Sequence, residues 1–133
     1  MAVTKESGRQ YALYADVVID YDDLTSAVAA EAIDLPAGAI VTGGFINILT
    51  VWNSATSDVL DIGDGADVDR YTPTPLDIDA AVGMQAITVT GFEYTANDTI
   101  DVIWTGVSTA PTTGQLHLVV EYILDGRANE NMG

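Results

Sequence analysis

The 133-residue chain contains no cysteine, which excludes disulfide bonds and metal sites built from thiolates. It also lacks any long apolar run, and stretches such as VIW and LVV are far too short to cross a bilayer. The opening segment, MAVTKESGRQ, has no apolar core of the kind found in secretory signal peptides. We therefore expect no membrane segment and no disulfide in this protein.

Basic residues are scarce as well. Lys and Arg together number 4, against 20 Asp plus Glu, which gives a formal net charge of −16 at pH 7. Such a charge repels phosphate backbones, so the composition argues against a nucleic-acid-binding protein. Residues 11–125 contain a single cation, Arg70, whereas Lys5, Arg9 and Arg127 lie near the two ends of the chain. The predicted body of the protein is therefore almost purely anionic.

Catalytic signatures are also missing. The motifs G-x-S-x-G and H-E-x-x-H and the phosphate-binding loop do not occur. The single histidine, His117, lies on the polar side of an alternating run, which favours a solvent-facing or interface position over a catalytic base. Aspartate pairs such as DID and DVD carry little information in a chain this acidic. We therefore predict a protein that is not an enzyme and that needs no cofactor.

The sequence does contain repeated alternation of apolar and polar residues with a period of two. It is clearest in residues 11–21, 99–105 and 115–124, where apolar side chains share one face. Turn residues separate these runs from one another. Further strands are predicted at 28–35, 40–52, 57–62, 76–80 and 86–92. The pattern predicts an all-β protein, an antiparallel β-sandwich of the jelly-roll type with about eight strands.

The sandwich is expected over residues 10–125, with a short polar N-terminal arm at 1–9 and a C-terminal tail at 126–133. Of the two tryptophans, Trp104 fits the core, whereas Trp52 fits either the core or a surface that stacks on a sugar. The alternation places the following residues in the core: Leu13, Val17, Ile19, Ile46, Ile48, Leu60, Ile62, Val89, Ile100, Val102, Trp104, Leu116, Leu118, Val120 and Tyr122.

The stretch IGDGADVDRY, residues 62–71, has the glycines and aspartates of a calcium loop. No register places acidic ligands at the offsets of an EF-hand, and the bidentate glutamate is missing. The alternative is a structural turn, in which Gly63 or Gly65 has a positive φ and the side chains of Asp64 and Asp67 cap their own backbone. We favour the turn and predict no metal, although three aspartates and backbone carbonyls remain an alternative way to hold an ion.

Arg70 is the basic residue of this stretch, and it follows Asp64, Asp67 and Asp69. A guanidinium group binds carboxylates through paired hydrogen bonds, and nothing else nearby can neutralise these aspartates. We predict that Arg70 lies within hydrogen-bonding reach of one of them and fixes the loop, rather than contacting a ligand.

The run AIDLPAGAIVTGGFINILTVWNSATSDVLDIGDGADVDRYTP, residues 32–73, resembles the capsid decoration or cementing proteins of tailed bacteriophages. In that group a strand leads into an LPAGA-V segment and a long apolar strand, and an NS-TSD-L-IGDG-D-DRY turn follows. The Tyr-rich opening strand and the closing Q-HLVVEY strand match in character. The resemblance implies a jelly-roll or related β-sandwich and makes IGDGADVDRY a structural turn.

The resemblance also implies a function. Such proteins bind the outer surface of the major capsid shell, as oligomers, and stabilise it. We therefore expect a virion protein whose partners are the phage major capsid protein and copies of itself, with a homotrimer favoured over a dimer. Flexible, cationic ends suit ionic contacts with the shell or with a neighbouring subunit, so Lys5, Arg9 and Arg127 are the candidate contact residues.

Two other classes of function stay open. One is a receptor- or glycan-binding module of a phage fibre or a lectin-like protein, which exposed aromatic side chains such as Trp52 and Tyr71 would support. The other is a small β-sandwich enzyme or calcium-dependent binder, which needs carboxylates that converge in a pocket.

Overall fold

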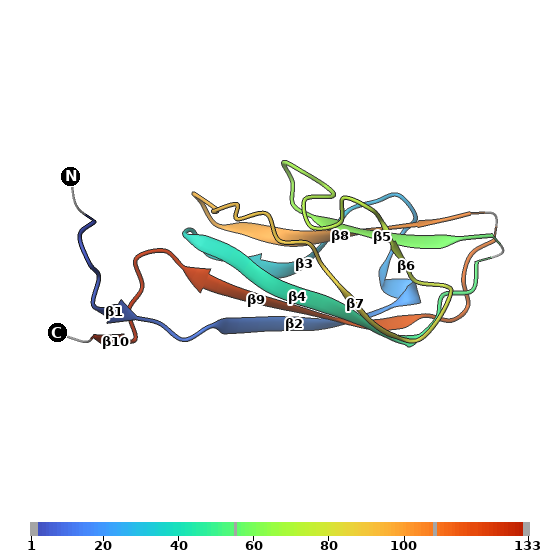
Figure 1. Ribbon diagram of the computed structural model, residues 1–133. Helices are drawn as coiled ribbons and strands as arrows, with labels where there is room; N and C mark the ends of the chain where they lie inside the picture. Colours follow the sequence, from blue (N-terminus) through green and yellow to red (C-terminus); the bar gives the residue numbers. More distant parts are fainter. Residues whose placement is uncertain (1–2, 55, 108, 132–133) are drawn as a thin grey trace.

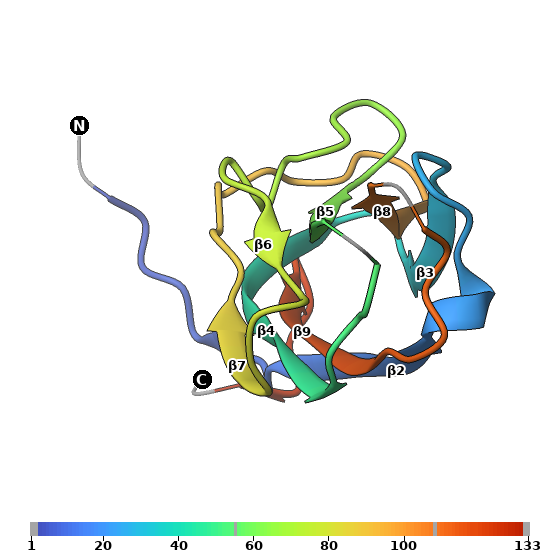
Figure 2. The same ribbon diagram turned by 90° about the vertical axis from the view of Figure 1, so that its right-hand side faces the viewer.

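In the computed structural model, which describes residues 3–54, 56–107 and 109–131, the chain forms two four-stranded antiparallel sheets (Figure 1). The strand orders are β2-β9-β4-β7 in one sheet and β3-β8-β5-β6 in the other. The strands are β2 (Leu13–Asp20), β3 (Ala30–Leu35), β4 (Ala39–Thr50), β5 (Asp58–Gly63), β6 (Leu76–Asp77), β7 (Gly83–Ala86), β8 (Asp98–Gly106) and β9 (Gln115–Leu124). Viewed along the strands, the sheets face each other across the core (Figure 2).

The connections between strands identify the sandwich as a jelly roll. Along the chain, every step from β2 to β9 passes from one sheet to the other, except the step from β5 to β6. Neighbours within a sheet are therefore strands distant in sequence, such as β2 beside β9 and β3 beside β8. This is the interleaved order of a double Greek key. The predicted fold class and its eight strands are confirmed.

Alternation of side chains creates the core between the sheets. In β9, Leu116, Leu118 and Val120 are fully buried, and the residues between them point outward. The strands β5 and β8 repeat the pattern with apolar residues on their inner faces. Eleven of the residues that alternation placed in the core are buried: Ile19, Ile46, Ile48, Leu60, Ile62, Ile100, Val102, Trp104, Leu116, Leu118 and Val120.

Four predictions of core residues differ from the structure. Leu13, Val17 and Tyr122 are only half-buried, and Leu13 pairs with Tyr122 towards one end of their sheet. Val89 is 45% exposed, so its placement in the core was wrong. The reason is that β7 ends at Ala86, the residue at which the predicted strand 86–92 begins.

Beyond β7 the backbone leaves the sheet. The amide of Thr88 donates a hydrogen bond of 2.9 Å to the carbonyl of Tyr71, in the loop after β5. Gly91 then takes a positive φ of 77°, which ends any extended conformation. The alternation therefore continues to Ile87, which is buried and whose amide still donates to Gly44 of β4, but not to Val89.

Outside the sandwich, the two ends of the chain pair with each other. Strand β1 (Gly8–Arg9) runs antiparallel to β10 (Glu130–Asn131). Figure 1 shows both ends at the same end of the sandwich, beyond β2 and β9.

Helix is limited, within the described ranges, to the single 3-10 turn η1 (Tyr21–Asp23). It follows β2 and closes a capping box, in which the side chain of Asp23 accepts a 2.8 Å hydrogen bond from the amide of Asp20. Across those ranges no helix reaches the length and apolar character that spanning a membrane requires.

Candidate functional site

The loop that follows β5 folds back onto the segment between β7 and β8. It begins where the amide of Asp64 donates a 2.9 Å hydrogen bond to the carbonyl of Asp67. It returns to the sheet where the amide of Tyr71 donates a 3.0 Å hydrogen bond to the carbonyl of Ile62. Residues 62–71 are therefore a compact turn anchored to the end of β5.

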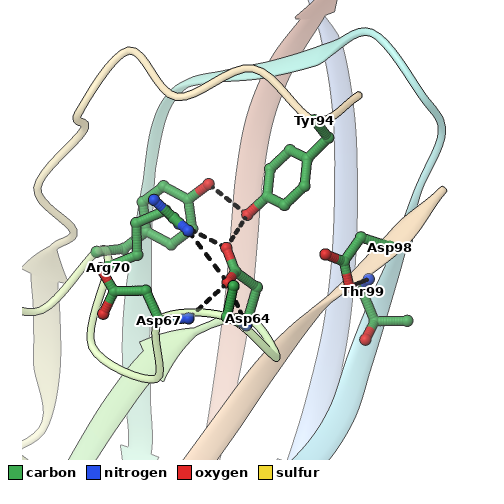
Figure 3. A network of polar contacts seen from close by, with 8 residues as sticks. Asp64, Asp67, Arg70, Tyr94, Asp98 and Thr99 are labelled. Atoms are coloured by element: carbon green, nitrogen blue, oxygen red, sulfur yellow. Dashed lines mark hydrogen bonds and ion pairs between the residues drawn. The ribbon is translucent and has the colours of Figure 1, made fainter. Parts of the chain in front are cut away.

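Asp64 is the centre of this turn (Figure 3). Its side chain is 1% exposed and accepts hydrogen bonds from the amides of Ala66, at 3.0 Å, and Asp67, at 2.9 Å. Arg70 donates to both of its oxygens, from Nε at 2.6 Å and from the terminal nitrogen at 3.3 Å. The prediction that Arg70 reaches one of the three aspartates is confirmed, and the partner is Asp64.

Aromatic side chains enclose the ion pair from the segment between β7 and β8. The guanidinium carbon of Arg70 lies 3.6 Å from the centre of the Phe92 ring, a cation–π contact. Tyr94 donates from its hydroxyl to Asp64 at 2.7 Å. Because that uses the single hydroxyl hydrogen of Tyr94, the hydroxyl of Tyr71, 2.7 Å away, must be the donor to Tyr94. We call Asp64, Arg70, Tyr71, Phe92 and Tyr94 the Asp64 cluster.

The electrostatics of the cluster keep Asp64 ionised and Tyr94 protonated. Burial raises the pKa of Asp64, but hydrogen bonds from Arg70, Tyr94 and the amide of Asp67 outweigh it, so the net pKa lies below the ordinary value. Burial, with the neighbouring Tyr71 and Asp64, raises the pKa of Tyr94. Each group therefore stays in the protonation state that its hydrogen bonds need.

Gly63 is required for lack of space, and not for the positive φ that was predicted. Neither Gly63 nor Gly65 has a positive φ, so that prediction was wrong. Instead, a Cβ atom on Gly63 would overlap the carbonyl oxygen of Asp67 and lie 2.5 Å from the carbonyl carbon of Val68. The turn closes so tightly over Gly63 that there is no room for a side chain, whereas Gly65 faces open space.

We expect Gly63→Ala to lower the free energy of unfolding by about 2–3 kcal/mol, because the added methyl group meets backbone atoms that cannot move without breaking the turn. The matched control is Gly65→Ala, where nothing lies within 4 Å of the added atom. The control should change stability by less than about 0.5 kcal/mol. Urea denaturation of both variants checks this, and equal midpoints for the two would contradict it.

The carboxylates of this loop do not converge on a cation site. No group of three or more metal-ligating side chains that could hold an ion occurs in the part of the chain that the structure describes. The oxygens of Asp64 already accept hydrogen bonds from four residues. Asp67 and Asp69 lie beside each other instead, since a hydrogen bond from the protonated side chain of Asp69 to Asp67 is the main cause of the raised pKa of Asp69.

We therefore expect calcium to have no effect on stability. Adding calcium, or a chelator in its place, should leave the melting temperature unchanged, because binding to the folded state alone would raise it. Differential scanning fluorimetry measures this directly. A shift of several degrees would revive the metal-site alternative.

The sequence also raised Trp52, Tyr71 and His117 as candidate binding or catalytic residues. Trp52 and Tyr71 are each 1% exposed, so neither offers a surface for stacking on a sugar. His117 is 34% exposed on the outer face of β9, as expected for the polar side of that strand, and its Nε2 lies 2.7 Å from Asp16.

A second buried carboxylate, Asp58, was not predicted. It lies at the start of β5, is fully buried and accepts hydrogen bonds from the amide and hydroxyl of Ser54 at 3.0 and 2.6 Å. It also accepts one of 2.8 Å from Nε1 of Trp104. The inward position of Asp58 in the alternation of β5, in register with Leu60 and Ile62, was the signal that could have revealed it.

Of the candidate contact residues, Arg9 lies in the strand pair β1–β10, Arg127 precedes β10, and Lys5 lies in the N-terminal segment before β1. We call residues 3–10 and 125–131 the terminal module. Gln10 joins its two parts: its amide nitrogen donates to the carbonyls of Leu124, at 2.7 Å, and Arg127, at 3.2 Å, and its oxygen accepts from the amide of Leu124 at 3.0 Å.

Further hydrogen bonds join the two ends of the chain. The amide of Asn129 donates to the carbonyl of Arg9 at 2.5 Å. The amide of Tyr11 donates to the side chain of Asn129 at 2.7 Å, and the Tyr11 hydroxyl donates to Glu130. The predicted arm and tail are thus in contact with each other, which the sequence did not indicate.

The module also holds the accessible positive charge of the protein. Lys5 and Arg9 are exposed and Arg127 is half-exposed, whereas the side chain of Arg70 is 13% exposed and paired with Asp64. These four are all the Lys and Arg of the chain. A partner that recognises cations on this protein therefore meets them at the terminal module.

Comparison with known proteins gives matches of structure only. No family model matches the chain, and no curated protein is significantly similar to it in sequence. The fold is similar to a chain in the acidic stable capsid structure of the Helicobacter pylori bacteriophage KHP30, with a TM-score of 0.68 and 13% identity over 90% of this chain and 92% of that one.

Two other phage structures match over similar lengths. A chain of the cyanophage Pam1 capsid asymmetric unit has a TM-score of 0.58 and 23% identity, over 93% of this chain and 92% of that one. A chain of the capsid of Ralstonia phage GP4 has a TM-score of 0.56 and 16% identity, over 95% and 91%. At these identities the likeness is one of fold, and the chain has the same jelly-roll architecture as proteins found in three phage capsids.

Proposed function

We propose that this chain is a structural, non-enzymatic virion protein that binds the outer surface of a phage capsid and stabilises it. It would do so as a homo-oligomer, with a trimer favoured. The observation that carries the proposal is the fold match to chains of three phage capsid structures, each over at least 91% of the matched chain. Because nearly the whole of each chain is matched, the likeness is not one of a shared fragment.

The resemblance of residues 32–73 to capsid decoration proteins supports the outer-surface role. The Asp64 cluster fits the same role, since it uses that stretch to fasten a loop instead of binding a ligand. A net charge of −16 fits a protein on the outside of a shell better than one in contact with packaged nucleic acid.

Binding to undecorated capsids of the parent phage tests the proposal. The full-length protein should co-sediment with such capsids at saturable stoichiometry and raise the temperature at which they disrupt, because a ligand of the intact shell stabilises it. Electron microscopy of the decorated particle should place the added density outside the shell. Failure to bind any capsid would overturn the proposal.

Removing residues 1–9 should weaken capsid binding by at least about tenfold, a loss of ~1.4 kcal/mol. The deletion takes away Lys5 and Arg9, two of the three accessible cations, and leaves the sandwich strands complete. The melting temperature of the truncated protein should therefore stay close to that of the parent. Wild-type affinity in the truncated protein would rule out a role for the arm in binding.

The glycan-binding alternative loses the support that Trp52 and Tyr71 would have given as exposed aromatic residues, because both are buried. A glycan array still separates the two functions. Binding to a glycan without binding to capsids would favour the alternative.

A further inference from the structure

The charge of the protein is divided between two regions of the surface. Within the terminal module, Lys5, Arg9 and Arg127 balance the three carboxylates of Glu6, Asp125 and Glu130. The whole net charge of −16 therefore resides on the rest of the chain, where the single basic residue, Arg70, forms an ion pair with Asp64. Contacts between copies that do not use the module would bring anionic surfaces together.

The outer face of the β3-β8-β5-β6 sheet is the most acidic part of the sandwich. Glu31 lies directly opposite Asp101 across β3 and β8, a like-charge pair that destabilises an isolated sheet. Asp34 is exposed on the same face of β3. We call the outward carboxylates of this sheet the acidic face: Glu31, Asp34, Asp61, Asp77 and Asp101.

Outward carboxylates have partners on both sheets, since Asp101 of the acidic face accepts a 2.6 Å hydrogen bond from Thr99. The opposite sheet differs in the spacing of these groups. Asp16 contacts His117 at 2.7 Å, and Glu121 accepts hydrogen bonds from Tyr14 at 2.5 Å and Thr42 at 2.7 Å. Exposed apolar side chains also separate these groups, among them Val18 at 49% and Met84 at 65%.

The terminal module has the shape and composition of a contact element. Figure 2 shows its N-terminal segment leaving the body of the sandwich, so that it can reach another molecule. It exposes Val3 at 95%, beside the charged Lys5 and Arg9. A hollow of about 340 Å³ lies between its two parts, lined by Arg127 and by Glu6 and Asp125 among others.

We propose that the terminal module of one copy docks on the acidic face of a second copy of this chain. Lys5, Arg9 and Arg127 would face Glu31, Asp34 and Asp101, which relieves the repulsion between Glu31 and Asp101. The contact joins two different surfaces, and such a contact forms a ring, as a trimer requires, when the rotation between successive copies closes. The inference rests on the oligomeric state in the proposed function and names the surfaces that create it.

Self-association of the full-length protein in solution, measured without capsids by sedimentation equilibrium, tests the inference. The double variant Lys5→Glu/Arg9→Glu should associate at least about tenfold more weakly than the parent. The charge-conserving control, Lys5→Arg/Arg9→Lys, should associate as the parent does. The variant Glu31→Lys/Asp34→Lys should lose association like the first, because it reverses the charge of the partner surface.

Combining all four charge reversals in one chain restores opposite charges at every contact, so association should return to within about threefold of the parent. Association that persists in the arm variant, or that fails to return in the combined variant, overturns the inference. A parent protein that stays monomeric at all concentrations overturns it too. Capsid binding by that monomer would leave the proposed capsid-binding role standing and overturn only the oligomeric state, whereas association without capsid binding would support the inference and overturn the capsid-binding role.

Discussion

Replacing Asp64 with alanine should lower the free energy of unfolding by about 3–5 kcal/mol, the largest effect that we expect from a single loop residue. The change leaves the guanidinium of Arg70, only 13% exposed, without its carboxylate. It also removes the acceptor of the buried Tyr94 hydroxyl and of two backbone amides. Urea denaturation followed by tryptophan fluorescence measures the loss.

The reciprocal change, Arg70→Ala, should cost less, about 1–3 kcal/mol, because Asp64 would keep its hydrogen bonds from Tyr94 and the amides. The matched control is Asp69→Ala in the same loop. Asp69 is exposed, and its neighbour Asp67 raises its pKa, so its removal should change stability by less than about 0.5 kcal/mol. Equal losses at Asp64 and Asp69 would show that the cluster does not stabilise the fold.

Acid should remove the contribution of Asp64. Its pKa in the folded state lies below the ordinary value of 3.8, so its stabilising effect is present above that pH and is lost as the pH falls through the folded pKa. The stability difference between the parent and an Asp64→Asn variant should therefore be large at about pH 7 and shrink at about pH 2.5. A difference that is constant over this range would mean that the ionised form of Asp64 contributes nothing.

The sequence predicted the sandwich because period-two alternation and the spacing of turns are local properties. The run 115–124 matches β9 in both bounds, since Leu116, Leu118 and Val120 recur at every second position and Gln115, His117 and Glu121 lie on the other face. The failure at Val89 has a non-local cause. That segment keeps an apolar pattern, but its backbone bonds to Tyr71, which lies in a loop far away in the sequence.

The candidate site likewise has one contact that the local sequence predicted and others that depend on the fold. The pairing of Arg70 with an aspartate followed from the presence of a single basic residue beside three aspartates in one short stretch, and the structure confirms it. The aromatic partners Phe92 and Tyr94 could not be found, because only the folding of the β7–β8 segment onto the loop brings them to Asp64. The pairing of β1 with β10 is hidden for the same reason, since it joins the two ends of the chain.

Asp58 leads to the second large effect. We expect Asp58→Ala to lower the free energy of unfolding by about 3–4 kcal/mol. The substitution removes the acceptor of the hydrogen-bond donors of Trp104 and Ser54, and a buried donor left unpaired costs about 1–3 kcal/mol. All three donors, two from Ser54 and one from Trp104, lie within 3.0 Å of the carboxylate of Asp58, which is itself fully buried. The effect is measured by urea denaturation.

Asp61 supplies the control for this prediction, because it lies on the same strand but faces outward and is half-exposed. Its hydrogen bond from Thr72 is long, at 3.3 Å, so Asp61→Ala should cost less than about 1 kcal/mol. Trp104→Phe keeps an aromatic ring and removes the donor to Asp58, so the losses from Asp58→Ala and Trp104→Phe should be non-additive when the two are combined. Additive losses would mean that the Trp104 hydrogen bond contributes nothing and that Asp58 acts through Ser54 alone.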